Sequence, residues 1–201
     1  IKLLDIEKNK NKKADFPSNF SISKHTNLVG TIGMLRPDRK PSLYITVFKF
    51  IKDFIKEEVH FILGGVGIEF QKIKDLRDET NLVDCFHMIG LVSNPEEIFS
   101  KLDIYVSVSV GKTTGISMIE AAMCKIPVVG IQLLEGYKAD ESDWVWSHTD
   151  LKKVAERIVF LLKNQKEREQ LIEEQYDYVV NNLTSDAMYS SYKSFYKKVL
   201  N

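Results

Sequence analysis

The fold is decided by residues 102–123, which read LDIYVSVSVGKTTGISMIEAAM. The first part of this stretch is an apolar run typical of a buried strand, expected at 103–108, and the last part has the composition of a helix, expected at 115–124. A loop rich in glycine and threonine connects the two. We therefore predict a strand–loop–helix unit of the kind from which parallel sheets are built.

The same alternation recurs on both sides of this stretch. We expect four further strands, at 28–33, 59–63, 85–89 and 127–131, and three further helices, at 43–55, 68–79 and 95–101. A shorter sixth strand is expected at 144–146, and apolar helical stripes at 151–162 and 188–199. The pattern predicts an α/β fold: a doubly wound parallel sheet with helices on both faces, and a helical C-terminal tail whose apolar faces cover the core.

The composition is that of one globular domain. The chain has 201 residues, of which 44% are hydrophobic, and this length can bury a core of ordinary size. Lysine plus arginine and aspartate plus glutamate are equal at 28 each, so no net charge favours nucleic acid as a partner. Cys85 and Cys124 lack metal-ligand spacing and are expected to be reduced core thiols of a cytosolic protein.

The N-terminal part differs from the rest. Residues 7–13 form a polar, basic run without apolar periodicity, so we expect a linker over 1–26 and one Rossmann-like domain over 27–201. The chain does not begin with methionine, and we expect Ile1 to be the cut end of a longer protein. No signal peptide is recognisable, and no apolar run approaches the roughly 20 residues that span a bilayer, which favours a cytoplasmic protein.

The loop 111–114 is expected at the carboxyl ends of the strands, where doubly wound sheets bind their ligands. Its sequence, GKTT, is similar to the end of a triphosphatase phosphate loop. Such a loop needs a glycine five positions before Gly111, and Val106 stands there. The dinucleotide fingerprint G-x-G-x-x-G also fails, because no third glycine at a helix start follows Gly30 and Gly33. Both classes of phosphate loop are therefore disfavoured.

A different anion site is predicted at the start of the helix 115–124. The first N–H groups of a helix have no intrahelical acceptor, and in the helix that starts at Gly115 they are expected to point at the ligand edge of the sheet. Glu120 is expected beside the buried face of the same helix, where a carboxylate is costly unless it accepts hydrogen bonds, such as those from ribose hydroxyls. An ordinary exposed glutamate is the alternative.

Basic residues follow the first expected strand. Arg36, Arg39 and Lys40 lie within five positions, at the same sheet edge as the expected helix start, and would suit a diphosphate. Across the edge, the hydroxyls of Thr113 and Thr114 would add hydrogen-bond donors. A solvated loop is the alternative, because charged runs in loops usually face water.

Four segments together resemble a known family. The segments 29–51, 59–73, 86–109 and 115–130 are similar, in order and spacing, to the C-terminal domain of glycosyltransferase family 4 (group 1), which has the GT-B fold. The resemblance implies retaining transfer of a sugar from a nucleotide diphosphate sugar to an acceptor hydroxyl, with no metal and no separate cofactor. It makes this chain the donor-binding half. A sugar or lipid-linked acceptor would bind an N-terminal domain absent from the chain, in polysaccharide biosynthesis and with peripheral association at the inner face of the membrane.

The resemblance also implies roles for single residues. The family's basic pair falls on Met34 and Arg39, so Arg39, with Lys40 beside it, would stabilise the departing diphosphate. Glu120 falls on the second glutamate of the family's E-x7-E signature, which grips the ribose, and Arg39, Lys40 and Glu120 are the implied catalytic set. The implied donor-binding residues are Met88 and Ile89 at the base, and Lys112, Thr113, Thr114, Gly115 and Ile116 at the sugar and phosphates.

Besides Met34, Lys112 and Lys125 depart from the family pattern. Lys112 stands where the first signature glutamate would contact the transferred sugar. This leaves open an alternative function, a nucleotide-sugar-binding module with reduced or no transfer. Lys125 stands where a glycine usually ends the helix, so we expect a residue with a side chain in a left-handed cap. The isolated chain is expected to bind nucleotide but to transfer no sugar, because the second wall of the cleft is missing.

Overall fold

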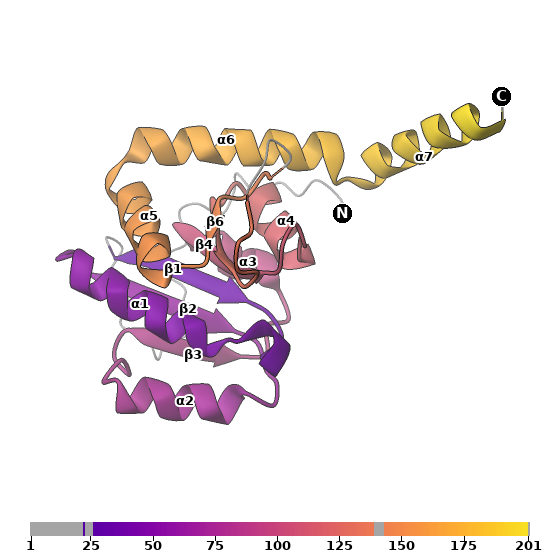
Figure 1. Cartoon of the computed structure of the whole chain (residues 1–201). Helices are drawn as coiled ribbons and strands as arrows, with labels where there is room; N and C mark the ends of the chain where they lie inside the picture. Colours follow the sequence, from indigo (N-terminus) through magenta and orange to yellow (C-terminus); the bar gives the residue numbers. More distant parts are fainter. Residues whose placement is uncertain (1–21, 23–25, 139–142, 201) are drawn as a thin grey trace.

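The chain forms a six-stranded parallel sheet with the strand order β3-β2-β1-β4-β5-β6 (Figure 1). The computed structural model describes residues 22, 26–138 and 143–200. The strands are β1 (Asn27–Ile32), β2 (Val59–Gly64), β3 (Phe86–Gly90), β4 (Ile104–Ser109), β5 (Val128–Gln132) and β6 (Ser147–His148). The helices are η2 (Pro37–Arg39), α1 (Ser42–Phe54), α2 (Phe70–Glu79), α3 (Pro95–Phe99), α4 (Ile116–Met123), α5 (Leu151–Lys163), α6 (Gln165–Asn182) and α7 (Ser185–Leu200).

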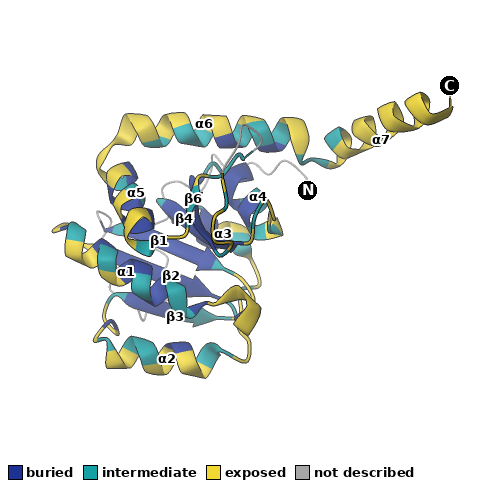
Figure 2. Cartoon of the chain, in the orientation of Figure 1, coloured by how far each residue is buried: buried dark blue, intermediate teal, exposed yellow. Residues whose placement is uncertain are grey.

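Helices cover both faces of the sheet, as the alternation of strands and helices predicts. Along β1, Val29 belongs to one buried cluster, which includes residues of α1, α2 and α5, and Leu28 belongs to a second cluster with α3, α4 and α6. All residues of β2, β4 and β5 are buried, which is why these strands read as continuous apolar runs rather than alternating ones. Figure 2 shows this buried layer between the helices.

The sixth strand lies later in the chain than predicted. It was expected at 144–146, but the residues that pair with β5 are Ser147 and His148. The preceding segment packs on α6 instead. The ring of Trp144 stacks on the ring of Tyr178, and the backbone carbonyl of Trp144 accepts a hydrogen bond from Gln175. The alternating aromatic pattern therefore predicted strand pairing wrongly: Trp144 is half-buried against α6, and Trp146 is 37% exposed.

The tail is helical as predicted, but only part of it covers the core. Helix α5 buries residues such as Val154 and Ile158, and α6 buries Val179. None of the residues of α7, all of which the structure describes, is buried, and the side chains of Met188 and Phe195 are 57% and 60% exposed. Figure 1 shows α7 extending away from the body of the molecule beyond the end of α6. Periodicity predicts an apolar helix face but not which surface covers it.

Two further expectations have different outcomes. Lys125 ends α4 with φ of 55°, the left-handed conformation expected there, and its Nζ lies 3.1 Å from Oε1 of Glu173 on α6. The linker expected at 1–26 lies outside the described residues, apart from Ile22 and Thr26.

In the parts of the chain that the structure describes, no helix has both the length and the apolar character needed to cross a membrane.

A buried histidine pair joins β2 and β3 near their amino ends. His87 Nε2 lies 2.9 Å from His60 Nδ1, and His60 Nε2 lies 3.2 Å from Oε1 of Glu58. With both rings neutral, His87 donates to His60 and His60 donates to Glu58, so the row is satisfied. Burial, together with a smaller effect of the neighbouring His60, lowers the pKa of His87 to about 4. Protonation would place charge in a site that water hardly reaches.

This pair predicts a dependence of stability on pH. The unfolded chain takes up a proton on His87 near pH 6.5, whereas the folded chain does so only near pH 4. The free energy of unfolding should therefore be fully present above pH 6.5 and fall by roughly 1–3 kcal/mol as the pH falls from 6.5 to 4. Urea unfolding across this range measures the slope, and His87→Gln should flatten it. Equal slopes in the two proteins would refute this account.

Candidate active site

A cavity of about 550 Å³ opens at the carboxyl edge of the sheet, between the ends of β1 and β4. The strand order reverses between these two strands, so their connections leave in opposite directions and a crevice remains between them. Six of the residues predicted from the sequence line this cavity: Arg36, Arg39, Thr114, Gly115, Ile116 and Glu120. Segments about 80 residues apart in the chain are thus brought to one site.

Buried residues with hydroxyl groups, which the sequence analysis missed, also line the cavity. Thr31, Tyr44, Tyr105 and Ser107 are all buried and all line it. The Tyr105 hydroxyl donates to the carbonyl of Ile32 over 2.9 Å, and burial raises its pKa, so this phenol stays neutral. The available signal was the presence of Thr31, Tyr105 and Ser107 inside otherwise apolar strands, because polar groups are costly to bury unless they find partners.

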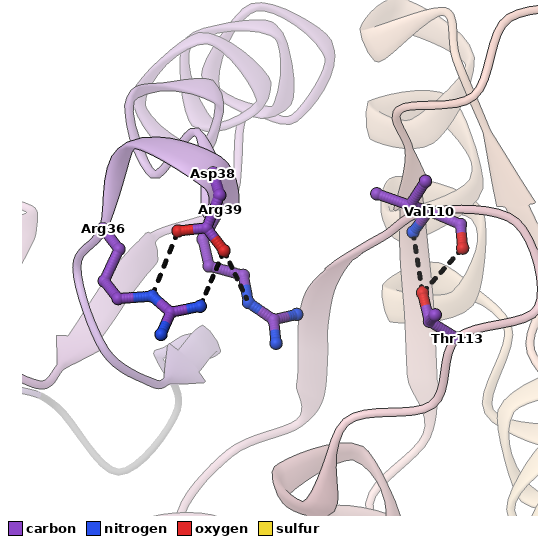
Figure 3. A network of polar contacts seen from close by, with 5 residues as sticks. All are labelled: Arg36, Asp38, Arg39, Val110 and Thr113. Atoms are coloured by element: carbon purple, nitrogen blue, oxygen red, sulfur yellow. Dashed lines mark hydrogen bonds and ion pairs between the residues drawn. The ribbon is translucent and has the colours of Figure 1, made fainter.

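The wall on the β1 side carries two arginines held by one aspartate (Figure 3). The guanidinium of Arg36 donates two hydrogen bonds to the carboxylate of Asp38, from Nε to Oδ1 at 3.0 Å and from Nη2 to Oδ2 at 2.6 Å. The Nε of Arg39 lies 3.9 Å from Oδ2 of the same carboxylate. The hydrogen bond from Arg36 lowers the pKa of Asp38, which therefore stays charged and offsets part of the positive charge. Both arginines line the cavity; Lys40, in a left-handed conformation with φ of 41°, is not among its lining residues.

The opposite wall is the start of α4. Gly115 precedes the helix in an extended conformation, and the first bond that closes a helical turn runs from the amide of Met118 to the carbonyl of Gly115. The amides of Ile116 and Ser117 come before that bond and have no acceptor within the helix. Both residues line the cavity. A helix start in this position favours an anion.

Glu120 stands one turn further along α4, at the side of the cavity. Its side chain is partly buried, and burial raises the pKa of its carboxyl above the usual range, with a further increase from the negative charge of Glu96. A carboxylate held partly out of water is stabilised by ligand groups that donate hydrogen bonds to it. Paired hydroxyls are such groups.

Lys112 and Thr113 belong to a neighbouring, smaller cavity. It has a volume of about 230 Å³, and Trp144 and Tyr178 are among its other lining residues. Thr114 lines both cavities, so the loop 110–114 is the partition between them. The hydroxyl of Thr113 is taken up within the loop, since it accepts from the amide of Val110 at 3.0 Å and donates to the carbonyl of Val110 at 2.7 Å (Figure 3).

Met88 and Ile89 are not brought to the main cavity. They lie on β3, which is separated from β1 by β2, and neither lines the cavity. Ile89 packs near Gly64 at the end of β2, where an added methyl group would lie 3.6 Å from its Cδ1. Of the predicted residues, therefore, six line the main cavity, two lie across a partition, two lie on β3, and Lys40 does not line the cavity.

The described residues hold no group of three or more histidine, cysteine, aspartate or glutamate side chains that could bind a metal ion. The positive charge at the main cavity comes instead from two guanidinium groups and a helix start. This arrangement can bind an anion with two or more phosphate groups on one side and a hydroxyl-bearing group on the other.

Comparison with known proteins gives consistent matches. The family model described as glycosyl transferases group 1 matches residues 12–178. The poly(ribitol-phosphate) alpha-N-acetylglucosaminyltransferase of Staphylococcus aureus (strain COL) is 26% identical over 171 residues, which make up 78% of this chain and 34% of that protein. The chain thus spans about a third of the length of this curated relative.

Two solved structures have the same fold. A crystal structure of an S. aureus TarM mutant, in complex with Fondaparinux, alpha-GlcNAc-glycerol and UDP, aligns with a TM-score of 0.70 at 20% identity, covering 88% of this chain and 38% of that one. The C-terminal domain of the glycosyl transferase group 1 family protein LpcC from Francisella tularensis aligns with a TM-score of 0.63 at 17% identity, covering 79% of this chain and 87% of that one.

Proposed function

The chain belongs to the glycosyl transferases group 1 family, and we propose that it is the donor-binding half of a retaining glycosyltransferase. In this proposal it binds a nucleotide diphosphate sugar, whose sugar passes to an acceptor hydroxyl. The observation that carries the proposal is the convergence of Arg39, the start of α4 and Glu120 on one cavity at the point where the strand order reverses. The cavity volume of about 550 Å³ suits a ligand of nucleotide size.

Each wall has a role in the proposed reaction. The bond between the sugar and the diphosphate breaks, and the diphosphate leaves with additional negative charge. Arg39 and the amides of Ile116 and Ser117 lie where they can stabilise that charge. Stabilising the charge that develops in the transition state is the main contribution of fixed cations and dipoles to such a step. Glu120 would accept hydrogen bonds from the ribose hydroxyls and so place the diphosphate against the helix start.

The proposal includes binding without a divalent metal. Arg36 and Arg39 both reach the cavity, and guanidinium groups bind phosphate in a bidentate manner. Together with the helix start they supply the positive charge that a metal ion supplies elsewhere. No separate cofactor is involved.

The acceptor side is proposed to come from a further domain. Exposed apolar side chains stand at the same sheet edge, including Met34, Leu91 and Ile116, and others lie along α7. A surface of this kind suits coverage by another folded part. In a longer cytoplasmic protein that domain would bind a sugar or lipid-linked acceptor, with peripheral association at the inner membrane face. The chain alone would bind the donor and transfer no sugar.

A nucleotide-sugar-binding module without efficient transfer is the second candidate. The observation that favours it is the position of Lys112, which replaces the expected glutamate and lines the smaller cavity rather than the main one. In this case the nucleotide part of the site would function and the contact to the transferred sugar would be missing.

Calorimetric titration with UDP tests the proposed function, using the nucleotide bound in the TarM crystal. The chain should bind UDP more tightly than uridine, in EDTA as well as in magnesium, because the diphosphate supplies the charge contacts. Arg39→Ala should weaken UDP binding by about 10- to 100-fold, the effect of about 1.5–3 kcal/mol from losing a charged hydrogen bond. Lys40→Ala, in the same turn but outside the cavity, should have a smaller effect. Equal binding of UDP and uridine, or a requirement for magnesium, would contradict the proposal.

Substitution of Glu120 tests the ribose contact. Glu120→Gln keeps the shape of the side chain but removes its charge, and should weaken UDP binding by about 1–3 kcal/mol with little change in the free energy of unfolding. Glu135→Gln is the control, since this glutamate is exposed beyond the end of β5 and does not line the cavity. Unchanged UDP affinity in Glu120→Gln would mean that Glu120 is an ordinary surface residue.

Substitution of Lys112 separates the two candidates. In a longer protein that carries this chain and its acceptor domain, Lys112→Glu should raise the transfer rate at least several-fold if Lys112 limits contact to the sugar. Its affinity for UDP alone should stay within about twofold, because Lys112 lies outside the main cavity. Efficient transfer by the wild type, lost in Lys112→Glu, would instead favour the glycosyltransferase with lysine as its native sugar contact.

A further inference from the structure

We propose that Gln132 is a positioning residue, which holds the loop 110–114 so that the start of α4 meets a diphosphate. The inference rests on the proposed function and extends it to a residue outside the cavity. Gln132 is the last residue of β5 and is 4% exposed. It lines neither of the two cavities described above.

The side chain of Gln132 binds three backbone groups at once. Its Oε1 accepts from the amide of Gly111 at 2.8 Å and from the amide of Leu134 at 2.9 Å, and its Nε2 donates to the carbonyl of Gly111 at 3.1 Å. The carboxamide thus pairs with both backbone groups of Gly111, as a neighbouring strand would. A side chain held by three bonds in a nearly dry site has little freedom to shift.

The bonded loop needs such support because its own geometry is unusual. Gly111 has φ of 60°, in the left-handed region, and turns the chain sharply after β4. Within the loop, Thr113 bonds back to Val110, which makes 110–113 a closed turn. The bonds from Gln132 attach this turn to the end of β5.

The loop leads directly into the cavity wall. Thr114 and Gly115 follow the turn and line the main cavity, and the amides of Ile116 and Ser117 come next. On its far side the loop is also held by the indole of Trp144, whose Nε1 donates to Oγ1 of Thr114 at 3.3 Å. A displacement of about 1 Å at Gly111 would move the amides relative to the arginines across the cavity, and such misplacement weakens binding and catalysis.

The chain offers a matched control for a purely structural role. Gln175 on α6 is 2% exposed, accepts from the amide of Val128 at 2.7 Å and donates to the carbonyl of Val128 at 2.9 Å. It therefore pairs with both backbone groups of one residue, as Gln132 does, but at the amino end of β5. Its Nε2 also donates to the carbonyl of Trp144 at 3.3 Å, so Gln175→Leu likewise removes three bonds to backbone groups, none of them in the loop 110–114. Loss of either glutamine removes similar buried hydrogen bonds.

The experiment compares Gln132→Leu with Gln175→Leu in the full 201-residue chain. Native-state hydrogen exchange at the amides of Gly111 and Leu134 and UDP affinity by calorimetry are measured for both. Gln132→Leu should speed exchange at these two amides and weaken UDP binding by about 5- to 50-fold. Gln175→Leu should leave UDP affinity within about twofold at a similar cost in the free energy of unfolding.

Several outcomes would overturn the positioning role: unchanged exchange at Gly111 in folded Gln132→Leu, unchanged UDP affinity, or an equal loss of affinity in the two variants. If Gln132→Leu fails to fold, Gln132→Glu replaces it. At neutral pH its carboxylate can accept from the amides but cannot donate to the Gly111 carbonyl, so faster exchange and weaker UDP binding are again expected. Failure of the wild type to bind UDP would count against the proposed function instead, because the exchange rates report on Gln132 without ligand.

Discussion

β1 and β4 pair in parallel at the centre of the sheet, although 71 residues separate the end of β1 from the start of β4 in the chain. The pairing brings Val29 beside Ile104 and Gly30 beside Tyr105, and the Tyr105 hydroxyl ties the two strands again at the carbonyl of Ile32. Because the connections leave these strands in opposite directions, their carboxyl ends cannot be covered by a single loop. The arginine turn after β1 and the helix start after β4 therefore face each other across an open crevice.

One negative charge offsets part of the positive charge of the arginines at the site. Asp38 occupies the fork of Arg36 and approaches Arg39, so two guanidinium groups are held in place by one carboxylate on their own turn. An exposed ion pair of this kind contributes little to folding. Its effect is to limit the positions of the two cations before a ligand arrives. On the opposite wall, the partial positive charge of the α4 start is fixed by the backbone and needs no such partner.

Periodicity and spacing predicted the architecture because they reflect burial, which each strand and helix records locally. The same reasoning placed Arg39 and Glu120 at one sheet edge, and the structure brings both to one cavity. It failed at 144–146, where the contacts of Trp144 with α6 outweighed strand pairing. It also failed at α7, whose apolar stripe is real but uncovered in the part of the chain that the structure describes. Gln132 could not be found from sequence, because its partner Gly111 lies 21 residues away and the bonds go to backbone atoms that carry no sequence signal.

The most direct test of the account is a crystal structure of this chain with UDP. Phosphate oxygens are expected within hydrogen-bonding distance of the Ile116 and Ser117 amides and of the Arg39 guanidinium, with the ribose hydroxyls at Glu120. UDP bound with its phosphates at Lys112, in the smaller cavity on the other side of the loop 110–114, would contradict the account and move the site across the partition.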